Sequence, residues 1–496
     1  MTINSVTGSQ LLDLLGDWAA GRGPLYRRIV NGLLQVIDRG LLPGGVRLPS
    51  ERSLAKALAV SRTTVVAAYE MLKGGGYLEA RQGSGTWVAT AAGQRPVLEG
   101  NEGIRDFLGQ DLMTRRITSD GAFIDFSIAA PTGVAVAEIL TDAYRSVADQ
   151  ELNGLLRGGG YAPAGLGDLR LAIADLMTQM AVPSTADQIL VTNGAQQAIW
   201  LAASLYVDGG AGVIIESPTY PGALDVFRAH GARLLPLAVG HNGLSVADFE
   251  QLVSHRAARL AYLIPTFHNP TGTVLGGLER ARVVQLATRF RIPVIEDITN
   301  DFLALDSDPP PPLASYSDDT PILTVGSMSK FVWPGLRVGW VRAPESTIIR
   351  LLRRKNTVDL GSSVLNQLVA ARLLTQADEI STIRRRDTTA RLAQVTSLLE
   401  ELLPSWNWQQ PQGGLSLWIR LPEGNAEQLA QVALRHGVGI VPGSNFDPEA
   451  GHTEHLRLAL SLDEDATDIG IRRLANAWNH YHRQYETEAE PVQLIV

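Results

Sequence analysis

Short apolar runs alternate with helical stretches through the middle of this chain, and that alternation restricts the possible folds more than any other feature of the sequence. Residues 188–192, 212–216 and 260–264 are rich in Ile, Leu and Val, as buried strands are. Strands that alternate with helices form an α/β sheet, and such sheets bind ligands at the carboxyl ends of their strands. We therefore expect a sheet of this kind with a ligand site at its edge.

The chain has 496 residues, more than one hydrophobic core usually organises, so we expect at least two domains. Hydrophobic residues make up 45% and charged residues 19%, an ordinary balance for a folded protein in water. No apolar run reaches the roughly 18 residues of a membrane span, and the N-terminus lacks a signal-peptide pattern, which predicts a cytoplasmic protein. The absence of Cys, and nine His without metal-ligand spacing, predict no metal site.

Charge is distributed unevenly along the chain. Residues 20–90 hold ten Lys and Arg against four Asp and Glu, a balance of +6. Because the whole chain carries −8, the remaining residues must sum to −14. The positive charge of residues 20–90 suits binding to nucleic acid, and the negative charge of the remaining residues excludes it for them. Charge alone leaves a solvated basic surface as an alternative.

Residues 20–90 have the order of elements of a winged helix-turn-helix domain. Apolar residues fall at helical spacing between Pro24 and Arg39, a second helix begins near Ser50, and a third follows Ser61, a good N-cap. Segments 77–81 and 86–89 flank glycine-rich residues and predict a hairpin. The exposed start of the third helix suits the major groove of DNA. The residues predicted to contact DNA are Arg52, Ser61, Arg62, Thr63, Thr64, Gly83, Ser84 and Gly85.

This segment resembles the GntR-type winged helix. The matching motifs are Leu-Pro-Ser-x-Arg-x-Leu-Ala from Leu48, Val-Ser-Arg-x-Thr-Val from Val60 and Gly-x-Gly-Thr-x-Val from Gly83. The resemblance implies a domain that binds a double-stranded DNA operator. Three-helix units with a hairpin also serve as protein-contact modules, and the elements alone leave that alternative open. Apolar periodicity fades between residues 91 and 121, so we expect a linker there.

Two strand ends further along carry a lysine and a carboxylate. The apolar run 325–330 ends in Ser329 and Lys330, and another, 292–297, ends in Asp297 about thirty residues upstream. A lysine amine forms the Schiff base with this cofactor, and a carboxylate keeps its pyridine nitrogen protonated so that the ring withdraws electrons. A lone aspartate at a strand end is often a helix cap, but the pair at this spacing favours the cofactor.

From about residue 122 to residue 480 the chain resembles the fold-type I aminotransferases, and we expect this domain to span residues 122–490. The resemblance implies an α/β fold that binds pyridoxal phosphate. It assigns the cofactor phosphate to the start of a helix at residues 194–196, where backbone N–H groups and the helix dipole attract anions, and to neighbouring hydroxyl and guanidinium groups. The residues that it assigns to the cofactor are Lys330, Asp297, Asn269, Tyr220, Gly194, Ala195, Gln196, Ser327, Ser329, Arg337 and Tyr161.

The implied roles of the remaining residues differ. Tyr220 stacks on the pyridine ring and Asn269 bonds the ring hydroxyl, although alone such a tyrosine is more often a core residue and Asn-Pro a turn. Tyr161 reaches the cofactor phosphate of a partner subunit; the alternative is a plain glycine-rich loop before a helix. Arg457 binds the carboxylate of a substrate or effector, for which the planar guanidinium is well suited.

One pair of positions departs from the resemblance. Regulators of this kind usually place a tyrosine two residues after the ring-nitrogen aspartate, and many aminotransferases place one three residues after it. Here those positions hold Thr299 and Asn300. Because neither position holds the usual tyrosine, catalysis is less expected than in the aminotransferases, whereas cofactor binding is still expected.

A winged helix, a linker and an aminotransferase-like domain in this order resemble the MocR-type regulators. The resemblance implies a homodimeric transcription regulator in which pyridoxal phosphate at Lys330, an amino-compound effector or both shift the DNA-binding state. Two alternatives stay open. A true aminotransferase with a DNA-binding appendage would use the same Lys330 and Asp297. A repressor whose large domain only dimerises would leave these residues without a role.

Overall fold

The computed structural model describes residues 6–15, 25–38, 41–74, 77–81, 85–89, 123–255, 258–306, 308–317 and 321–489. The chain divides into two compact units, residues 1–117 and residues 118–496. Each unit has hydrophobic core clusters of its own, so each is described by itself.

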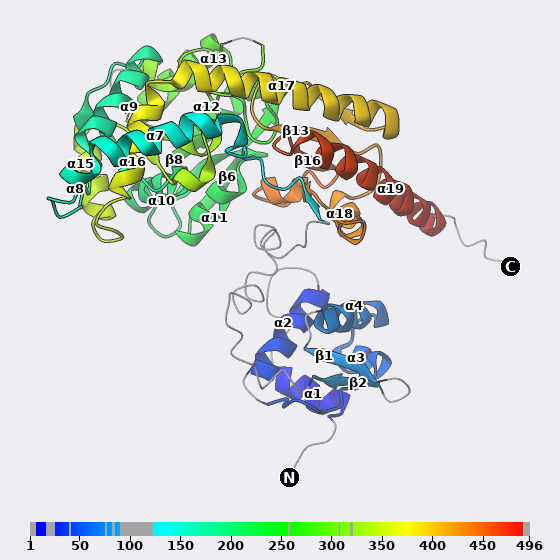
Figure 1. The fold of residues 1–496 in the computed structure, drawn as a ribbon. Coiled ribbons are helices and arrows are strands. Elements are labelled where there is room, and N and C mark those ends of the chain that lie inside the picture. The colour runs from blue at the N-terminus through cyan, green and yellow to red at the C-terminus, as the bar shows by residue number, and fades with distance from the viewer. Residues whose placement is uncertain are drawn as a thin grey trace. The chain divides into compact units, whose positions relative to one another are not determined.

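In its described residues, the first unit combines four helices with a two-stranded antiparallel hairpin (Figure 1). Serine side chains begin two of the helices: the Ser53 backbone N–H donates to Ser50 at 3.2 Å, and the Thr64 backbone N–H donates to Ser61 at 3.1 Å. The apolar faces of the helices pack together in one core. The elements are α1 (Gly8–Leu15), α2 (Leu25–Asp38), α3 (Glu51–Leu58), α4 (Arg62–Gly74), β1 (Leu78–Arg81) and β2 (Gly85–Val88).

Helix α1 is an element that the sequence analysis did not predict. Its residues Leu11 and Leu15, together with Val6, are buried in the core of the first unit. This core therefore extends upstream of residue 20. Gly85 begins strand β2, with a φ of +100°, and pairs with Arg81, whereas the sequence analysis placed it in the turn. The predicted DNA contacts Gly83 and Ser84 and the predicted linker, residues 91–121, lie outside the described residues.

The second unit is built on a mixed sheet of eight strands in the order β4-β11-β10-β9-β8-β5-β6-β7. The five central strands, β10, β9, β8, β5 and β6, are parallel to one another, and β11 and β7 run antiparallel to the strands that they pair with. The sheet therefore has the α/β character that the alternating sequence predicts. Its strands are β4 (Ile189–Thr192), β5 (Gly212–Ser217), β6 (Arg233–Gly240), β7 (Gly243–Leu244), β8 (Ala258–Leu263), β9 (Val294–Asp297), β10 (Ile322–Ser327) and β11 (Gly339–Arg342).

Helices cover both faces of this sheet (Figure 1). Strand β5 shows why: Ile214 belongs to one core cluster, whereas Val213 and Ile215 belong to the other, because successive side chains of a strand point to opposite faces. One face packs against α7 (Ala137–Gln150), α9 (Gly167–Gln179), α12 (Val246–Ser254), α13 (Gly277–Phe290) and α16 (Val364–Leu374). The other packs against α10 (Ala195–Tyr206), α11 (Pro221–Ala229) and α15 (Glu345–Lys355).

The C-terminal part of this unit forms a smaller sheet, β12-β13-β16-β15, with a core cluster of its own. A two-stranded parallel pair joins β14 to β3, near the start of the unit. The strands of the smaller sheet are β12 (Asn407–Trp408), β13 (Ser416–Arg420), β15 (Val441–Pro442) and β16 (His455–Ala459). The strands of the parallel pair are β3 (Ile124–Asp125) and β14 (Val438–Gly439). The helices of this part are α17 (Ala377–Leu402), α18 (Ala426–Arg435) and α19 (Glu464–Ala489). Short helices α8 (Leu152–Leu155) and α14 (Met328–Phe331) and several 3₁₀ turns complete the unit.

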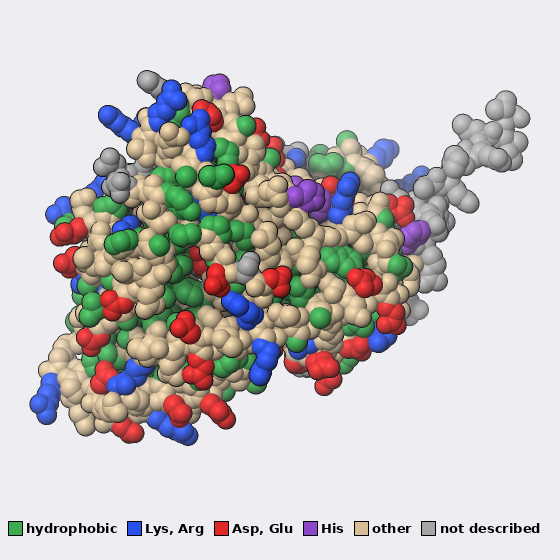
Figure 2. Space-filling view, turned by 90° about the horizontal axis from the view of Figure 1, so that it is seen from above, with side chains coloured by type: hydrophobic (Ala, Val, Ile, Leu, Met, Phe, Trp, Pro, Cys, Tyr) green, Lys and Arg blue, Asp and Glu red, His purple; other side chains and the backbone are tan. Residues whose placement is uncertain are grey.

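Within the described ranges, no helix is long and apolar enough to cross a lipid bilayer. The same residues contain no group of three His, Asp or Glu side chains that could hold a metal ion. Figure 2 shows one face of the molecule, on which acidic and basic side chains are interspersed.

Candidate functional site

The carboxyl ends of strands β9 and β10 bring Asp297 and Lys330 to the same edge of the sheet. Asp297 is the last residue of β9 and pairs with Val325 of β10. Lys330 lies on α14, the single turn of helix that directly follows β10. Because the two strands are parallel neighbours, residues that follow their carboxyl ends meet at one side of the sheet. The structure therefore brings together Lys330 and Asp297, the two residues from which the sequence analysis predicted a cofactor site.

The Asp297 carboxylate is buried, at 3% exposure, and it accepts hydrogen bonds from two residues. The hydroxyl of Tyr262, on the neighbouring strand β8, donates to it at 2.7 Å, and the backbone N–H of Thr299 donates at 3.0 Å. Burial raises the pKa of Asp297, and these hydrogen bonds oppose that rise. Sequence reasoning missed Tyr262; the one signal was a tyrosine within an aliphatic strand.

The amine of Lys330 donates to the backbone carbonyl of Ala129 and lies near two charged groups. Burial, and to a lesser extent the Arg457 guanidinium, lower its pKa from 10.5 to about 7, and the Asp297 carboxylate opposes that shift. An amine with a pKa near 7 is largely unprotonated just above neutral pH. Only the unprotonated amine can attack a carbonyl carbon, so this environment suits a nucleophilic lysine.

The Arg457 guanidinium, from strand β16, is buried at 7% exposure and is bound by neutral oxygens. It donates to the side-chain oxygen of Asn269 at 3.1 Å and to the carbonyl of Ser127, and it lies 4.8 Å from the centre of the Phe446 ring. Its Nε has no hydrogen-bond partner. Burial lowers the pKa of Arg457 to about 10. Tyr220 and the Asp125 carboxylate oppose that shift, but no carboxylate among the described residues accepts a hydrogen bond from the guanidinium, so this group is suited to bind an anion.

Tyr220 lies at the start of α11, among the same charged groups. Burial raises its pKa to about 12; the Asp297 carboxylate adds to the rise, and the Arg457 and Arg337 guanidinium groups oppose it. The side chain of Gln196 donates to the carbonyl of Gly222 at 2.8 Å. A Cβ at Gly222 would lie 2.5 Å from the Tyr220 hydroxyl, so glycine allows the tyrosine to fold back over this turn.

The turn between β4 and α10, residues 193–195, leads into the exposed N–H groups at the start of α10. Gly194 has a φ of +85°, and a Cβ there would lie 3.2 Å from the guanidinium of Arg337. Arg337 donates to the Asn193 carbonyl at 2.6 Å. The N–H groups of the first turn of a helix have no acceptor within the helix, so Ala195 and Gln196 can offer theirs to an anion. We call residues 193–195 the anion cup.

Two serines near Lys330 are also brought to this edge. The Ser327 hydroxyl donates to Ser329 at 2.9 Å and accepts the backbone N–H of Ser329 at 3.1 Å, which begins α14. Tyr161 differs from the other predicted cofactor residues, because its side chain is 73% exposed in the loop before α9. Among the residues that the structure describes, its side chain forms no hydrogen bond or ion pair with the buried cluster of its own chain.

The structure gives Thr299 and Asn300 roles of their own. Thr299 donates its backbone N–H to Asp297, and the Asn300 side chain donates to the Phe267 carbonyl at 2.8 Å. Phe267 has a φ of +46°, an unfavourable conformation for a residue with a side chain, and directly precedes the His268-Asn269 turn. Asn300 thus supports the turn that carries Asn269.

In the first unit, the predicted DNA contacts cluster at the start of α4 and on α3. Arg62, Arg52 and Thr63 are exposed. The Ser61 hydroxyl lies 2.7 Å from the hydroxyls of both Thr63 and Thr64, in addition to accepting the Thr64 backbone N–H. Ser61 is therefore engaged in beginning the helix, and Arg62 is the cation that the helix start presents.

Comparisons with known proteins match both units. A model of the class I and II aminotransferases matches residues 123–474, and a model of the bacterial regulatory proteins of the gntR family matches residues 25–88. The uncharacterized HTH-type transcriptional regulator YdfD of Bacillus subtilis is 30% identical over 89% of this chain and 94% of its own length. The 2-aminoadipate transaminase of Thermus thermophilus is 31% identical over 64% of this chain and 79% of its own length.

Solved structures resemble the second unit. The α-aminoadipate aminotransferase LysN of Thermus thermophilus, in complex with N-(5'-phosphopyridoxyl)-L-leucine, has a TM-score of 0.69 and 27% identity, and it covers 75% of this chain and 96% of its own. Together with the family matches, this likeness confirms the expected fold class, a GntR-type winged helix followed by a fold-type I aminotransferase domain.

Proposed function

Because the chain belongs to the MocR-type transcriptional regulators, with a GntR-type winged helix and an aminotransferase-like domain, we propose that it binds pyridoxal phosphate through Lys330. The observation that carries the proposal is the Lys330 amine, whose pKa burial lowers to about 7 at the strand edge shared with Asp297. The lowered pKa supplies an unprotonated amine, and the nearby carboxylate supplies a partner for a ring nitrogen.

The donor set around Lys330 fits this cofactor. Asp297 would hold the pyridine nitrogen, Tyr220 the face of the ring and Asn269 the ring hydroxyl. The phosphate would be held by the anion cup, residues 193–195, with Gln196, Ser327, Ser329 and Arg337. When bound, pyridoxal phosphate supplies an electron-withdrawing ring to which amines attach reversibly. The chain's own residues position it and set the charge around it.

We propose that the regulated signal is the cofactor, an amino compound with a carboxylate, or both. Arg457 supports the carboxylate, since its guanidinium is buried, donates only to neutral oxygens and keeps an unpartnered Nε. An effector carboxylate would compete with the Ser127 carbonyl and the Asn269 amide for this guanidinium. A charge-assisted, bidentate contact is stronger than a contact with a neutral oxygen, so the effector has a driving force to displace them.

The second unit also has the surface expected of a homodimer. Apolar side chains are unusually exposed near Tyr161 and in the segment that follows α15: Leu156 at 72%, Val358 at 51% and Leu360 at 56%. Exposed apolar surface of this kind favours association. A partner subunit would cover it and would bring the exposed Tyr161 toward the partner's cofactor phosphate.

Operator binding by the first unit would use Arg62 and Arg52, with Thr63 beside them and Gly83 to Gly85 at the hairpin. Ser61 and Thr64 would fix the helix start. Since a regulator must reach chromosomal DNA, we expect it to act in the cytoplasm.

A second candidate function is amino-group transfer, favoured because Lys330, Asp297, Asn269 and Arg457 lie together. One experiment separates the two. Purified protein with added pyridoxal phosphate is given an amino acid and a keto acid, and product is measured alongside operator binding. We expect effector-dependent operator binding and slow turnover, because Thr299 and Asn300 replace the usual tyrosine. Turnover at the roughly 1–10³ per second of ordinary enzymes, without any operator binding, would reverse the assignment.

A further inference from the structure

Nearly every polar group of Asn193 forms a hydrogen bond that holds the anion cup against neighbouring parts of the unit. Its carbonyl accepts from Arg337, its backbone N–H donates to the side-chain oxygen of Gln197 at 2.8 Å, and its side-chain amide donates to Asp359 at 3.3 Å. The neighbouring Gly194 carbonyl accepts from the Thr192 hydroxyl at 3.0 Å. Because these groups are occupied, the turn is held in one conformation, with the following N–H groups left for an anion.

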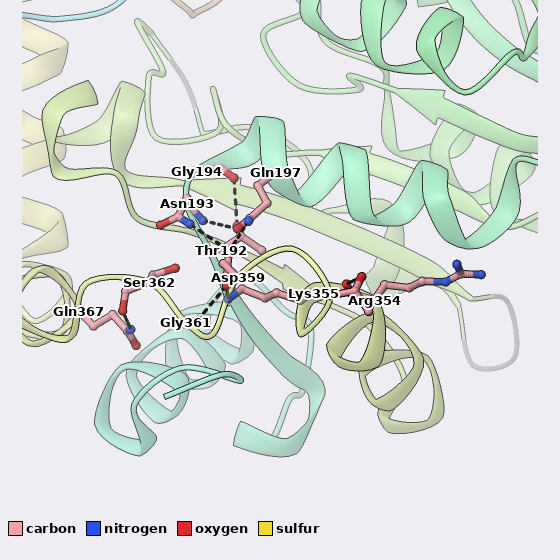
Figure 3. Close-up of polar contacts among 11 residues, drawn as sticks. Thr192, Asn193, Gly194, Gln197, Arg354, Lys355, Asp359, Gly361, Ser362 and Gln367 are labelled. Atoms are coloured by element: carbon pink, nitrogen blue, oxygen red, sulfur yellow. Dashed lines mark hydrogen bonds and ion pairs between the residues drawn. The ribbon is translucent and has the colours of Figure 1, made fainter. Parts of the chain in front are cut away.

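One carboxylate, that of Asp359, binds the side chains of both Asn193 and Gln197. Asp359 Oδ2 accepts from the side-chain amides of both Gln197, at 2.5 Å, and Asn193 (Figure 3). Its other oxygen accepts from the amine of Lys355 and from the backbone N–H of Gly361 at 2.9 Å. Asp359 therefore contacts the cup through two side chains and is itself held by a lysine one helical turn earlier in the chain.

The chemistry of this cluster needs an explanation, because a carboxylate beside an anion site opposes anion binding. Lys355 offsets that opposition: it is fully buried at the end of α15 and pairs with Asp359. Burial alone would raise the pKa of Asp359, but the hydrogen bonds from Lys355 and Gln197 outweigh it and lower the pKa. The carboxylate is thus kept ionised, as it must be to accept from four donors at once.

The segment that follows Asp359 is also fixed. Gly361 has a φ of +136°, and a Cβ there would lie 2.9 Å from the Ala162 carbonyl, next to Tyr161. Gln367 donates to the Ser362 carbonyl at 2.9 Å and accepts from the Leu166 backbone N–H at 2.7 Å. Asp359 lies where the cup, α15 and the Tyr161 loop meet.

We propose that Asp359, neutralised by Lys355, is a positioning residue that orients Asn193 and Gln197 and thereby sets the affinity of the anion cup for a phosphate group. This inference rests on the proposed function, since the phosphate is that of pyridoxal phosphate. It is separate from the attachment of the cofactor at Lys330, because the partners of Asp359 are Asn193, Gln197, Lys355 and Gly361.

The test compares two ligands that differ only in the phosphate. Dissociation constants of pyridoxal phosphate and of pyridoxal are measured by absorbance for the full chain and for three variants: Asp359→Asn, Gln197→Ala, and Asp359→Asn combined with Lys355→Met. Asp359→Asn should weaken pyridoxal phosphate by about tenfold or more, as expected when hydrogen bonds to a charged group are lost, and leave pyridoxal unchanged. Gln197→Ala keeps the ion pair and should show a smaller loss of the same kind. Arg354→Ala, on the exposed face of the same helix, is the control.

The double variant separates positioning from a buried unpaired charge. Asp359→Asn alone leaves Lys355 buried without its partner, which destabilises the fold, and the second substitution removes that charge. The inference predicts that the double variant regains thermal stability and still binds pyridoxal phosphate weakly. Restored phosphate affinity in the double variant, or equal losses for both ligands in Gln197→Ala, would overturn it. A wild-type chain that binds pyridoxal phosphate no more tightly than pyridoxal would overturn the assignment of the cup itself. A wild-type chain that binds neither would overturn the proposed function.

Discussion

Arg457 and Asn269 lie 188 positions apart in the sequence and are joined by a hydrogen bond of 3.1 Å from guanidinium to amide oxygen. Arg457 belongs to β16 of the small sheet, and Asn269 follows β8 of the large sheet. The bond therefore links the small four-stranded sheet to the large sheet at the candidate site. An effector carboxylate that bound the Arg457 guanidinium would compete with its hydrogen bond to Asn269. It would do so where the small sheet meets the large one.

Replacing Arg457 by Ala should weaken the response to amines that carry a carboxylate by about ten- to hundredfold, since a charge-assisted contact is lost. Amines without a carboxylate should be affected much less, and absorbance from the cofactor at Lys330 should remain. The measurement is the spectral change on titration with each amine. Arg420→Ala, an exposed arginine on the same sheet, should behave like the wild type. Equal weakening for both classes of amine would assign Arg457 a purely structural role.

Replacing Lys330 by Ala should abolish the visible absorbance that the wild-type protein acquires with pyridoxal phosphate. The reason is that its amine is buried at the strand edge and is the group that we propose to attach the cofactor. Lys56→Ala, an exposed lysine of the first unit, is the matched control and should retain the full band. If the wild type stayed colourless with excess cofactor, the proposal of a cofactor at this site would be wrong.

The rate at which pyridoxal phosphate attaches should rise with pH through a midpoint near 7. Burial lowers the pKa of Lys330 to about 7, and only the unprotonated amine reacts. At that pKa the unprotonated fraction rises from about a tenth at pH 6 to about nine tenths at pH 8. Stopped-flow absorbance across this range measures the midpoint. A midpoint near the ordinary lysine value of 10.5 would show that the amine is not desolvated as the structure indicates.

Replacing Tyr262 by Phe should destabilise the second unit by roughly 1–3 kcal/mol, because the buried Asp297 loses one of its donors. The ring should keep its edge contact with Phe227, whose centroid lies 5.9 Å away. Since the hydrogen bond from Tyr262 lowers the pKa of Asp297, its loss should raise that pKa further. Urea unfolding measures the stability. Tyr206→Phe, which keeps its contact with Arg350, should change it little.

Replacing Arg62 by Ala should cost on the order of 1–3 kcal/mol of operator affinity if the guanidinium pairs with a guanine. Binding by the wild type should weaken steeply as salt rises, because contacts with phosphates release counterions. Fluorescence anisotropy with specific and random duplexes tests both statements. Arg435→Ala, exposed on α18 of the second unit, should bind as the wild type does. An equal loss on every duplex would make Arg62 a phosphate contact.

Much of the fold follows from local patterns in the sequence. Helical spacing predicted α2, α3 and α4, with Ser61 as the N-cap before α4, and the alternation of apolar runs predicted the α/β sheet. Helix α1 was missed, because it is short and few of its residues define an apolar face without the core that covers them. The site residues at strand ends were predictable for a related reason: in a parallel sheet, the carboxyl ends of neighbouring strands necessarily meet at one edge.

The sequence by itself determined the order of the two units, the strand ends that carry Asp297 and Lys330, and the glycine-opened helix of the anion cup. Tertiary structure alone decided which groups surround them. Tyr262 donates to Asp297, Arg457 joins Asn269, and Asp359 joins Asn193, from positions that no local pattern relates. The physical reason is that capping and periodicity act over a few residues. The pKa of Lys330 and the partners of Arg457 depend instead on burial and on charges that only the folded chain brings together.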